Sequence, residues 1–244
     1  MLETHTIFDD VAAGAKKPAA HRVTDIKEAV RDRNRVNIYI DDKFFCSLDI
    51  SQVVDLRVKI GREFTAEELE ELKRASDFGK FYARALEYTL MRPRSTQEIQ
   101  DYLKRKTLDR KVRVKNRKTG EYSTQTKKGY DSSLVPLVLK RLDERGYLND
   151  RRFAEIWVEN RNVSKGTSVK KLRIELMQKG IDQAIIDEVL LESGRDERAE
   201  LRKIIARKAA KYPDQRKLAQ YLLRQGFNYS DISDELSSIE SSSV

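Results

Sequence analysis

Three short stretches of the chain decide its fold: EIQDYLKRK at residues 98–106, KLRIELMQKG at residues 171–180 and KLAQYLLRQG at residues 217–226. They align without gaps and carry apolar side chains at the same two positions, which are Ile99, Leu172 and Leu218, then Leu103, Leu176 and Leu222. Residues four apart lie on one face of an α-helix. The pattern therefore predicts three equivalent amphipathic helices and an internal repeat.

Each of these helices is expected to follow a longer helix and to precede a shorter one. The longer segments are FYARALEYTLM (81–91), RRFAEIWVENR (151–161) and ERAELRKIIARKAAKY (197–212). The shorter ones are SLVPLVLKRLDERG (133–146), QAIIDEVLLES (183–193) and YSDISDELSS (229–238). A period of roughly 45–50 residues is typical of helical arrays. The sequence therefore predicts a mainly α fold, with three tandem three-helix repeats forming an elongated, curved body.

The N-terminal part of the chain follows a different period. HRVTDIKEAV (21–30) and RVNIYI (35–40) alternate apolar and polar residues, and a DDK turn leads into FFCSLDI (44–50). This alternation predicts strands. We therefore expect a disordered arm over residues 1–20, a small β-rich domain over 21–63, and helical repeats over 64–148, 149–193 and 194–240.

Local signals mark where several helices begin and end. Thr65 with Glu68, and Ser95 with Glu98, have the spacing of a capping box. A glycine follows a predicted helix at three places, where a left-handed residue favours the helix end: Gly146, Gly180 and Gly226.

The stretch KRKTLDRKVRVKNRKTGEYSTQTKKG at residues 104–129 interrupts the first repeat. Between Lys104 and Lys128 it holds 11 Lys or Arg and two carboxylates, so its net charge of +9 equals that of the whole chain. Alternation of Val112 and Val114 with basic residues predicts a β-hairpin insertion over residues 107–130, projecting roughly 24 Å. Its candidate contacts to phosphate are Lys111, Arg113, Lys115, Arg117, Lys118, Lys127 and Lys128, with Tyr122 as a candidate for base stacking. A solubilising mobile loop is the alternative interpretation.

Composition disfavours several classes of function. The chain has one Cys, Cys46, and two His, so we expect no disulfide framework, no metal site, no cofactor and no catalytic set. KGTS at 165–168 lacks the glycine order of a phosphate-binding loop after a strand, so Thr167 or Ser168 is expected to cap a helix instead. No apolar run approaches the roughly 18 residues of a membrane span, and the N-terminus does not resemble a signal peptide. We therefore expect a cytoplasmic protein with no membrane partner.

Longer motifs in the second and third repeats resemble a known family. LDERGYLNDRRFAEIWVENR (142–161), SKGTSVKKLRIELMQKGI (164–181) and YLLRQGF (221–227) are similar to the three-repeat core of the RecX family, over about residues 75–237. Some members of that family also carry an N-terminal β-rich extension. The insertion at 107–130 departs from the compact family pattern, as does Asn149, which replaces an Asp often found there but can also cap a helix.

The resemblance implies a non-enzymatic regulator that binds the RecA–DNA filament. Such a protein inhibits or modulates RecA recombinase and its ATPase activity in recombination, DNA repair and the SOS response. The partners implied are the RecA filament and single-stranded DNA, with duplex DNA as a second candidate, and a monomer is favoured because the repeats supply their own packing. The alternative is a general DNA-binding helical repeat protein that acts by competing for DNA.

The second repeat supplies a further set of candidate contacts to the filament or to DNA. These residues crowd its first two helices: Arg151, Arg152, Arg161, Lys165, Lys170, Lys171 and Arg173. A solvated helix face explains them equally well. Phe153 and Trp157 are expected to belong to the core rather than to an exposed stacking pair. For Glu175, a local ion pair and a contact to a partner are both open.

Overall fold

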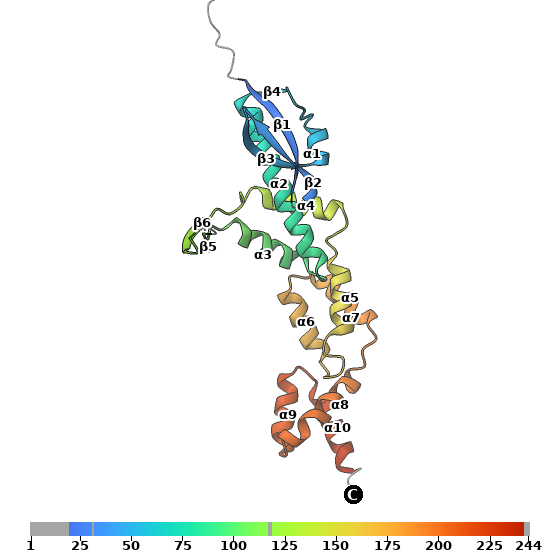
Figure 1. Ribbon diagram of the computed structural model, residues 1–244. Coiled ribbons are helices and arrows are strands. Elements are labelled where there is room, and N and C mark those ends of the chain that lie inside the picture. The colour runs from blue at the N-terminus through green and yellow to red at the C-terminus, as the bar shows by residue number, and fades with distance from the viewer. Residues whose placement is uncertain (1–19, 31, 117–118, 242–244) are drawn as a thin grey trace, which may run out of the picture. The chain divides into compact units, whose positions relative to one another are not determined.

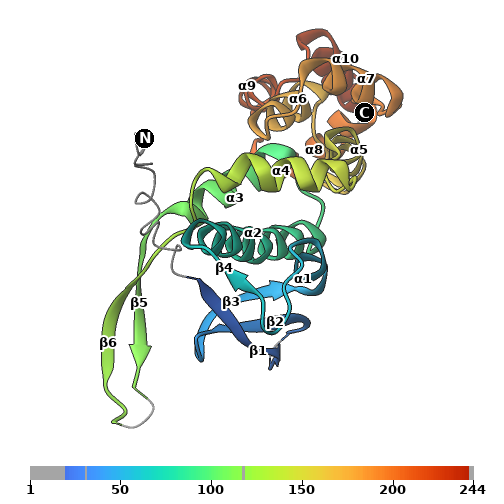
Figure 2. The same cartoon turned by 90° about the horizontal axis from the view of Figure 1, so that it is seen from above.

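The computed structural model describes residues 20–30, 32–116 and 119–241 (Figures 1 and 2). The arm predicted for residues 1–20 lies outside the described residues except for Ala20, and so do Arg117 and Lys118 of the candidate site. The chain forms two compact units, of which the first ends at Lys80 and the second begins at Phe81.

The N-terminal unit is built on an antiparallel sheet. Its strands are β1 (His21–Ala29), β2 (Asp32–Ile40), β3 (Lys43–Asp49) and β4 (Glu63–Phe64), arranged in the order β3-β2-β1-β4. The predicted DDK turn joins β2 to β3, and Asp41 and Asp42 both have positive φ, 49° and 63°. Two successive positive φ angles match the right-handed twist of a hairpin. The β-rich N-terminal domain predicted from the alternation is confirmed.

Two helices complete this unit. Helix α1 (Ile50–Asp55) begins at a capping box formed by Asp49 and Gln52. Helix α2 (Ala66–Leu90) begins at the predicted capping box, in which Thr65 Oγ1 accepts from the Glu68 amide (3.3 Å) and Glu68 accepts from the Thr65 amide (2.8 Å). Leu72 of α2 is buried against the sheet core, which explains why the unit extends to Lys80.

Cys46 belongs to the same core. Its side chain is 3% exposed, and burial raises the pKa of the thiol to about 11. Because the thiolate is the nucleophilic form, a thiol with this pKa is unreactive near neutral pH. Cys46 is therefore a packed core residue.

The C-terminal unit contains the predicted helical repeats. After α2, the first repeat continues with α3 (Thr96–Thr107) and α4 (Leu134–Glu144). The second contains α5 (Asp150–Asn160), α6 (Val169–Gln178) and α7 (Gln183–Glu192). The third contains α8 (Glu197–Lys208), the short 3-10 helix η1 (Ala209–Lys211), α9 (Gln215–Arg224) and α10 (Tyr229–Ser241). The mainly α fold with a basic hairpin insertion is confirmed.

The aligned apolar positions occupy equivalent places in the cores of the repeats. At the first position Ile99 and Leu172 are 0% exposed and Leu218 is 3% exposed; at the second, Leu103, Leu176 and Leu222 are all 0% exposed. The glycines predicted to end helices adopt positive φ, at 72° for Gly146, 74° for Gly180 and 96° for Gly226. Burial of the repeated face is thus what holds each three-helix unit together.

Successive repeats join through the middle helices α3, α6 and α9. Lys179, at the end of α6, pairs with Glu98 of α3 at 2.7 Å. At the equivalent place in the next junction, the Gln225 carbonyl accepts from Ser168 Oγ (2.6 Å). Gly180 lies so close to Gln97 that an added Cβ would meet its side chain at 2.6 Å. The end of each middle helix therefore docks on the start of the preceding one.

The capping box predicted for Ser95 and Glu98 is only half formed, because the junction between repeats uses Glu98. Ser95 Oγ accepts from the Glu98 amide at 3.2 Å, as expected. The Glu98 carboxylate, however, binds Lys179 and Arg92 instead of the Ser95 amide. Charge-assisted hydrogen bonds are stronger than a bond to a neutral amide, so the Glu98 carboxylate binds the cations at the junction between repeats.

Candidate nucleic-acid interface

The basic insertion forms a two-stranded hairpin. Strand β5 (Arg110–Lys115) pairs with β6 (Tyr122–Lys127) in antiparallel register, from Arg110 opposite Lys127 to Lys115 opposite Tyr122. Figure 2 shows the two strands side by side, leading away from α3 and α4. Six residues per strand correspond to an arm of about 20 Å.

The two faces of the hairpin differ in chemistry. Lys111, Arg113 and Lys115 alternate with the valines and therefore share one face, on which Lys115 is opposite Tyr122. The Arg113 guanidinium lies 4.4 Å from the centre of the Tyr122 ring and the Lys115 ammonium lies 5.7 Å from it. The face thus combines three cations with an aromatic ring. A base that stacked on Tyr122 would replace the guanidinium or lie on the other side of the ring.

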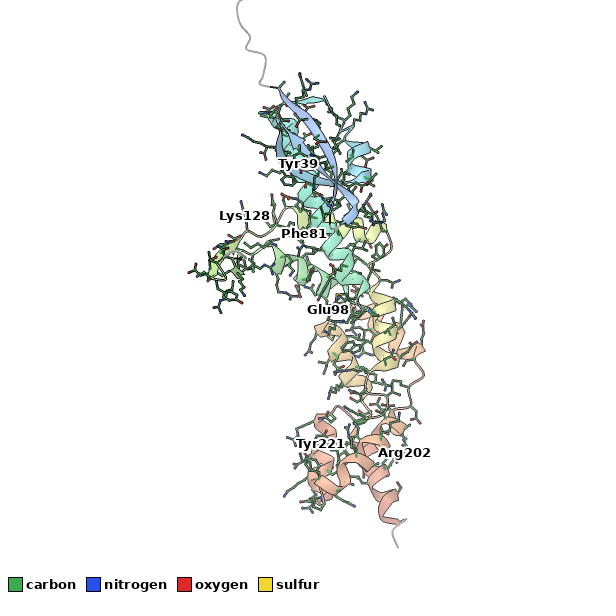
Figure 3. The ribbon with its side chains drawn as sticks, in the orientation of Figure 1. Tyr39, Phe81, Glu98, Lys128, Arg202 and Tyr221 are labelled. Carbon is green, nitrogen blue, oxygen red and sulfur yellow. The ribbon has the colours of Figure 1, made fainter. Side chains whose placement is uncertain are left out.

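The hairpin presents cations whose charge the described part of the chain does not neutralise. Lys111, Arg113, Lys115, Lys127 and Lys128 are exposed, and none of them forms an ion pair with a carboxylate of the described residues. Figure 3 places Lys128 where the hairpin joins the helices. Cations without partners attract a polyanion at little cost, because no internal pair has to be broken.

The base of the hairpin is fixed to the helical unit. The Gly129 amide donates to Asp109 (2.9 Å), and Tyr130 stacks on Phe81 with ring centres 4.4 Å apart. A Cβ added to Gly129 would lie 2.1 Å from the carbonyl oxygen of Thr107, so the chain crosses itself closely here. The hairpin is therefore anchored where it leaves α3 and returns toward α4.

A positive cluster lies at this base, and Lys127 is its one member among the residues predicted from the sequence. Burial lowers the pKa of Lys106, and the neighbouring cations Arg110, Arg84, Arg105 and Lys127 lower it further. All four neighbouring cations act on Lys106 in the same direction, so positive charge is concentrated at the base of the hairpin. Arg105, Lys106 and Arg110 belong to the basic stretch that starts at Lys104, so the sequence could have indicated them. Arg84 comes from α2, and only the fold brings it here.

The second repeat uses most of its candidate cations internally. Arg151 binds Glu188 and Glu192, Arg152 binds Glu155, Arg161 binds Glu175 and Arg173 binds Asp187. Lys171 donates to the side chain of Gln225 at 2.8 Å. Lys165 and Lys170 are exposed and have no ion pair among the described residues. The four predicted arginines are therefore all ion-paired, and Lys171 binds a neutral partner. Lys165 and Lys170 remain without an ion pair among the described residues.

Glu175 has a local role. Its carboxylate accepts from Arg161 Nε (2.7 Å) and from Trp157 Nε1 (3.1 Å). Burial raises the pKa of Glu175, but the hydrogen bonds from Arg161 and Trp157 outweigh it, so the pKa lies below its usual range. Phe153 is 4% exposed, and Trp157 packs against the same core cluster. Of the two interpretations left open for Glu175, a local ion pair or a contact to a partner, the structure shows the local ion pair.

This pKa shift predicts how the stability of the protein depends on pH. A carboxylate with a lowered folded-state pKa stabilises the fold above its unfolded pKa of about 4.5, and this contribution is lost as the pH falls through the folded pKa. The Glu175→Gln variant should therefore be less stable than the parent at pH 7, and the difference should shrink as the pH falls below about 4.5. Urea unfolding at pH 7, 5, 4 and 3 measures it. Glu188→Gln, at an exposed pair, is the control; equal pH profiles for the two variants would contradict the prediction.

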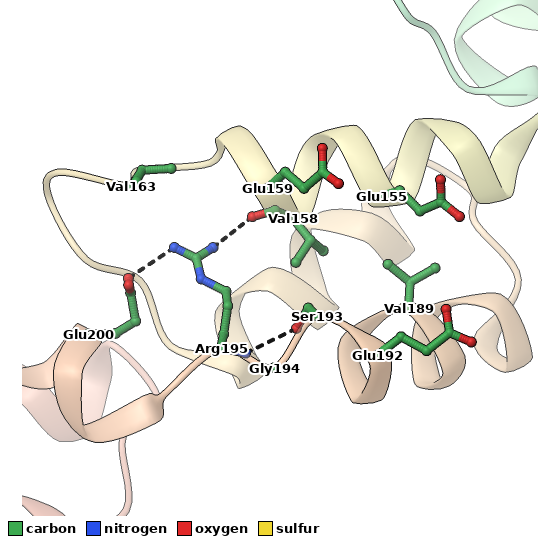
Figure 4. Close-up of a pocket in the computed structure, with 10 residues that line it drawn as sticks. All are labelled: Glu155, Val158, Glu159, Val163, Val189, Glu192, Ser193, Gly194, Arg195 and Glu200. Carbon is green, nitrogen blue, oxygen red and sulfur yellow. Dashed lines mark hydrogen bonds and ion pairs between the residues drawn. The ribbon is translucent and has the colours of Figure 1, made fainter.

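An acidic groove lies between the second and third repeats (Figure 4). Its volume is about 600 Å³, and Glu155, Glu159 and Glu192 line it together with Val158 and Val189. Carboxylates repel phosphate, so this groove does not belong to the nucleic-acid interface.

Within residues 20–30, 32–116 and 119–241, no three or more His, Cys, Asp and Glu side chains are placed to hold a metal ion together. The helices in these ranges include none with the length and apolar character needed to cross a membrane.

Comparisons with known proteins agree with this architecture. The model of the second three-helix domain of RecX matches residues 149–190, which contain α5, α6 and most of α7. The model of the N-terminal domain of the regulatory protein RecX matches residues 21–65, which contain the sheet. The chain belongs to the RecX family. The resemblance noted in the sequence is thereby confirmed.

Relatives in the RecX family align over most of the chain. The regulatory protein RecX of Bacillus licheniformis is 28% identical over 221 residues, which cover 88% of this chain and 76% of the relative. That of Bacillus subtilis is 29% identical over 225 residues, covering 89% and 77%. A crystal structure of a regulatory protein RecX aligns with a TM-score of 0.68 at 22% identity, covering 88% of this chain and 99% of the other. This similarity shows that the RecX fold is shared.

Proposed function

We propose that this member of the RecX family regulates RecA by binding the RecA–DNA filament and lowering its ATPase activity. The helical repeats recognise the filament, and the hairpin adds contacts to its DNA or to an acidic surface of RecA. The observation that supports the hairpin's part is its face of Lys111, Arg113 and Lys115, whose charges have no ion-pair partner in the described chain. The protein acts by binding, as a cytoplasmic monomer, and not by catalysis.

The chemistry of the hairpin fits a phosphate backbone. Arginine and lysine are the usual donors to phosphate, and their binding releases counterions from the nucleic acid. A mobile solubilising loop would mix charges of both signs, whereas β5 and β6 contain no carboxylate. The anchored base also fits a binding arm better than a loose loop.

A titration of the full chain into RecA assembled on single-stranded DNA tests the proposal. ATP hydrolysis should fall at a ratio of regulator to RecA well below one, because each bound molecule affects several filament subunits. The loss should persist when DNA is then added in excess. Unchanged hydrolysis at equimolar protein would contradict the proposal.

General DNA binding is the second candidate function. Lys165 and Lys170 of the second repeat are exposed and lack ion-pair partners in the described chain, so the repeats themselves offer cations to DNA. In this case any effect on RecA would come from competition for the strand. Excess single-stranded DNA would then restore ATP hydrolysis, which separates the two functions in the same titration.

A further inference from the structure

A small cationic cavity lies at the junction of the second and third repeats. Its volume is about 220 Å³, and the residues that line it include Lys165, Thr167, Lys171, Arg207 and Gln225. Three of these side chains are cations, and no Asp or Glu lines the cavity. The sequence could not indicate it, because Arg207 comes from α8, far along the chain from the loop that precedes α6.

Backbone constraints hold this loop in place. The amides of Lys165 and Gly166 both donate to the Asn162 carbonyl, at 2.9 and 2.8 Å, and Asn162 itself has a φ of 51°. Gly166 has a φ of 76°, and a Cβ there would lie 2.5 Å from the carbonyl oxygen of Glu200 in α8. Only glycine fits this close approach, so the loop is pressed against the third repeat.

The hydroxyl of Thr167 has no hydrogen-bond partner. The residue is 2% exposed, and its Oγ1 is buried without a donor or acceptor in the described part of the structure. Buried hydroxyl groups are normally satisfied, and an exception beside a polar cavity points to a ligand or a bound water. The unpartnered hydroxyl of Thr167 thus points to a ligand independently of the three cations.

The start of α6 is already satisfied by protein groups. Glu200 accepts from the Thr167 amide (2.9 Å), Glu197 accepts from the Val169 amide (3.0 Å), and Ser168 Oγ accepts from the Lys171 amide (3.1 Å). A ligand in the cavity would therefore be held by side chains and not by the helix amides. Lys171 uses one of its three ammonium donors for Gln225 and keeps two for a ligand.

We propose that this cavity binds a phosphate group through Lys165, Lys171, Arg207 and the Thr167 hydroxyl. Arginine and lysine provide the charge, and the hydroxyl donates to a phosphate oxygen. The volume equals about seven water molecules, enough for one phosphate with part of its hydration. The group is either a backbone phosphate of a nucleic acid or the phosphate of a small molecule. The site can be tested separately from the proposed regulation of RecA, since phosphate binding is measured without RecA.

Amide chemical shifts of the full chain, titrated with inorganic phosphate without RecA, test this proposal. Sodium chloride at equal ionic strength provides the reference. The Gly166 and Thr167 amides should shift in a saturable manner. Arg207→Gln should weaken phosphate binding about tenfold because it removes a charge-assisted donor. Arg216→Gln, which removes an exposed cation of α9 outside the cavity, should leave binding unchanged.

Thr167→Val separates binding from folding. Replacing an unpartnered buried hydroxyl with a methyl group should leave the protein at least as stable without phosphate, yet phosphate binding should weaken several-fold. Shifts that do not saturate, or that are equal in all variants and in sodium chloride, would overturn the proposal. A (dT)12 oligonucleotide identifies the source: displacement of phosphate by the oligonucleotide indicates a nucleic-acid backbone, and its absence indicates a small phosphate compound.

Discussion

Replacing Lys111, Arg113 and Lys115 together with Gln should weaken binding to single-stranded DNA about 50-fold at 0.15 M monovalent salt. These side chains lie on one face of the hairpin and have no ion pairs with described carboxylates. Each phosphate contact on a single strand contributes about 0.7 to the slope of log K against log salt, so three lost contacts lower the slope by about 2. Fluorescence anisotropy at several salt concentrations gives both quantities.

The control for this variant removes the same charge from another place. Arg33, Lys43 and Lys59 are exposed cations of the N-terminal unit, and their replacement with Gln also lowers the net charge by three. That control should change affinity by less than about threefold, since exposed charges that make no direct phosphate contact are largely screened by salt. Equal losses in the two triple variants would show that only net charge matters and would exclude a specific role of the hairpin face.

Replacing Arg195 with Met should lower the free energy of unfolding by about 3 kcal/mol. Arg195 joins the second repeat to the third: it donates to the carbonyl of Val158 (2.9 Å) and to Glu200 (3.0 Å), as Figure 4 shows. Glu200 is buried and Arg195 is mostly covered, with 7% and 12% exposure of their side chains. Loss of the guanidinium leaves a buried carboxylate whose remaining ion-pair partner among the described residues is Lys203. Urea unfolding at pH 7 measures the effect.

A matched variant and a double variant make this prediction specific. Arg198→Met removes a half-exposed arginine from the first turn of α8, three residues after Arg195, and should cost less than about 1 kcal/mol. Adding Glu200→Gln to Arg195→Met should restore part of the lost stability, because the uncompensated charge is gone. An Arg195→Met protein as stable as the Arg198→Met protein would show that the junction does not depend on this pair.

The fold could be predicted because its signals are local or periodic. The six aligned apolar positions, such as Leu103 and Leu176, are buried because a four-residue spacing fixes a helix face whatever surrounds it. The Thr65 capping box formed for a similar reason, since its two partners lie within one turn. The alternation in β5 likewise determines which residues share a face.

The candidate site was harder to predict from the sequence, because carboxylates far along the chain determine which of its cations form ion pairs. Arg151 and Lys165 are both basic residues of the second repeat. Helix α7 places Glu188 and Glu192 beside Arg151 and not beside Lys165. Glu98 has the spacing of a capping residue, yet the next repeat supplies Lys179 as a stronger partner. No local pattern reports which cation will meet a carboxylate after folding.

The exposure of the hairpin has a kinetic consequence. Every side chain of β6 is exposed and only Val112 of β5 is partly covered, so the arm buries no apolar face. A ribbon of this kind is marginally stable by itself, and its order depends on the anchor at Asp109 and Gly129. Charges carried on such an arm act mainly while two molecules approach each other. The hairpin should therefore set how fast a polyanionic partner is captured, whereas contacts of the packed repeats set how long it stays.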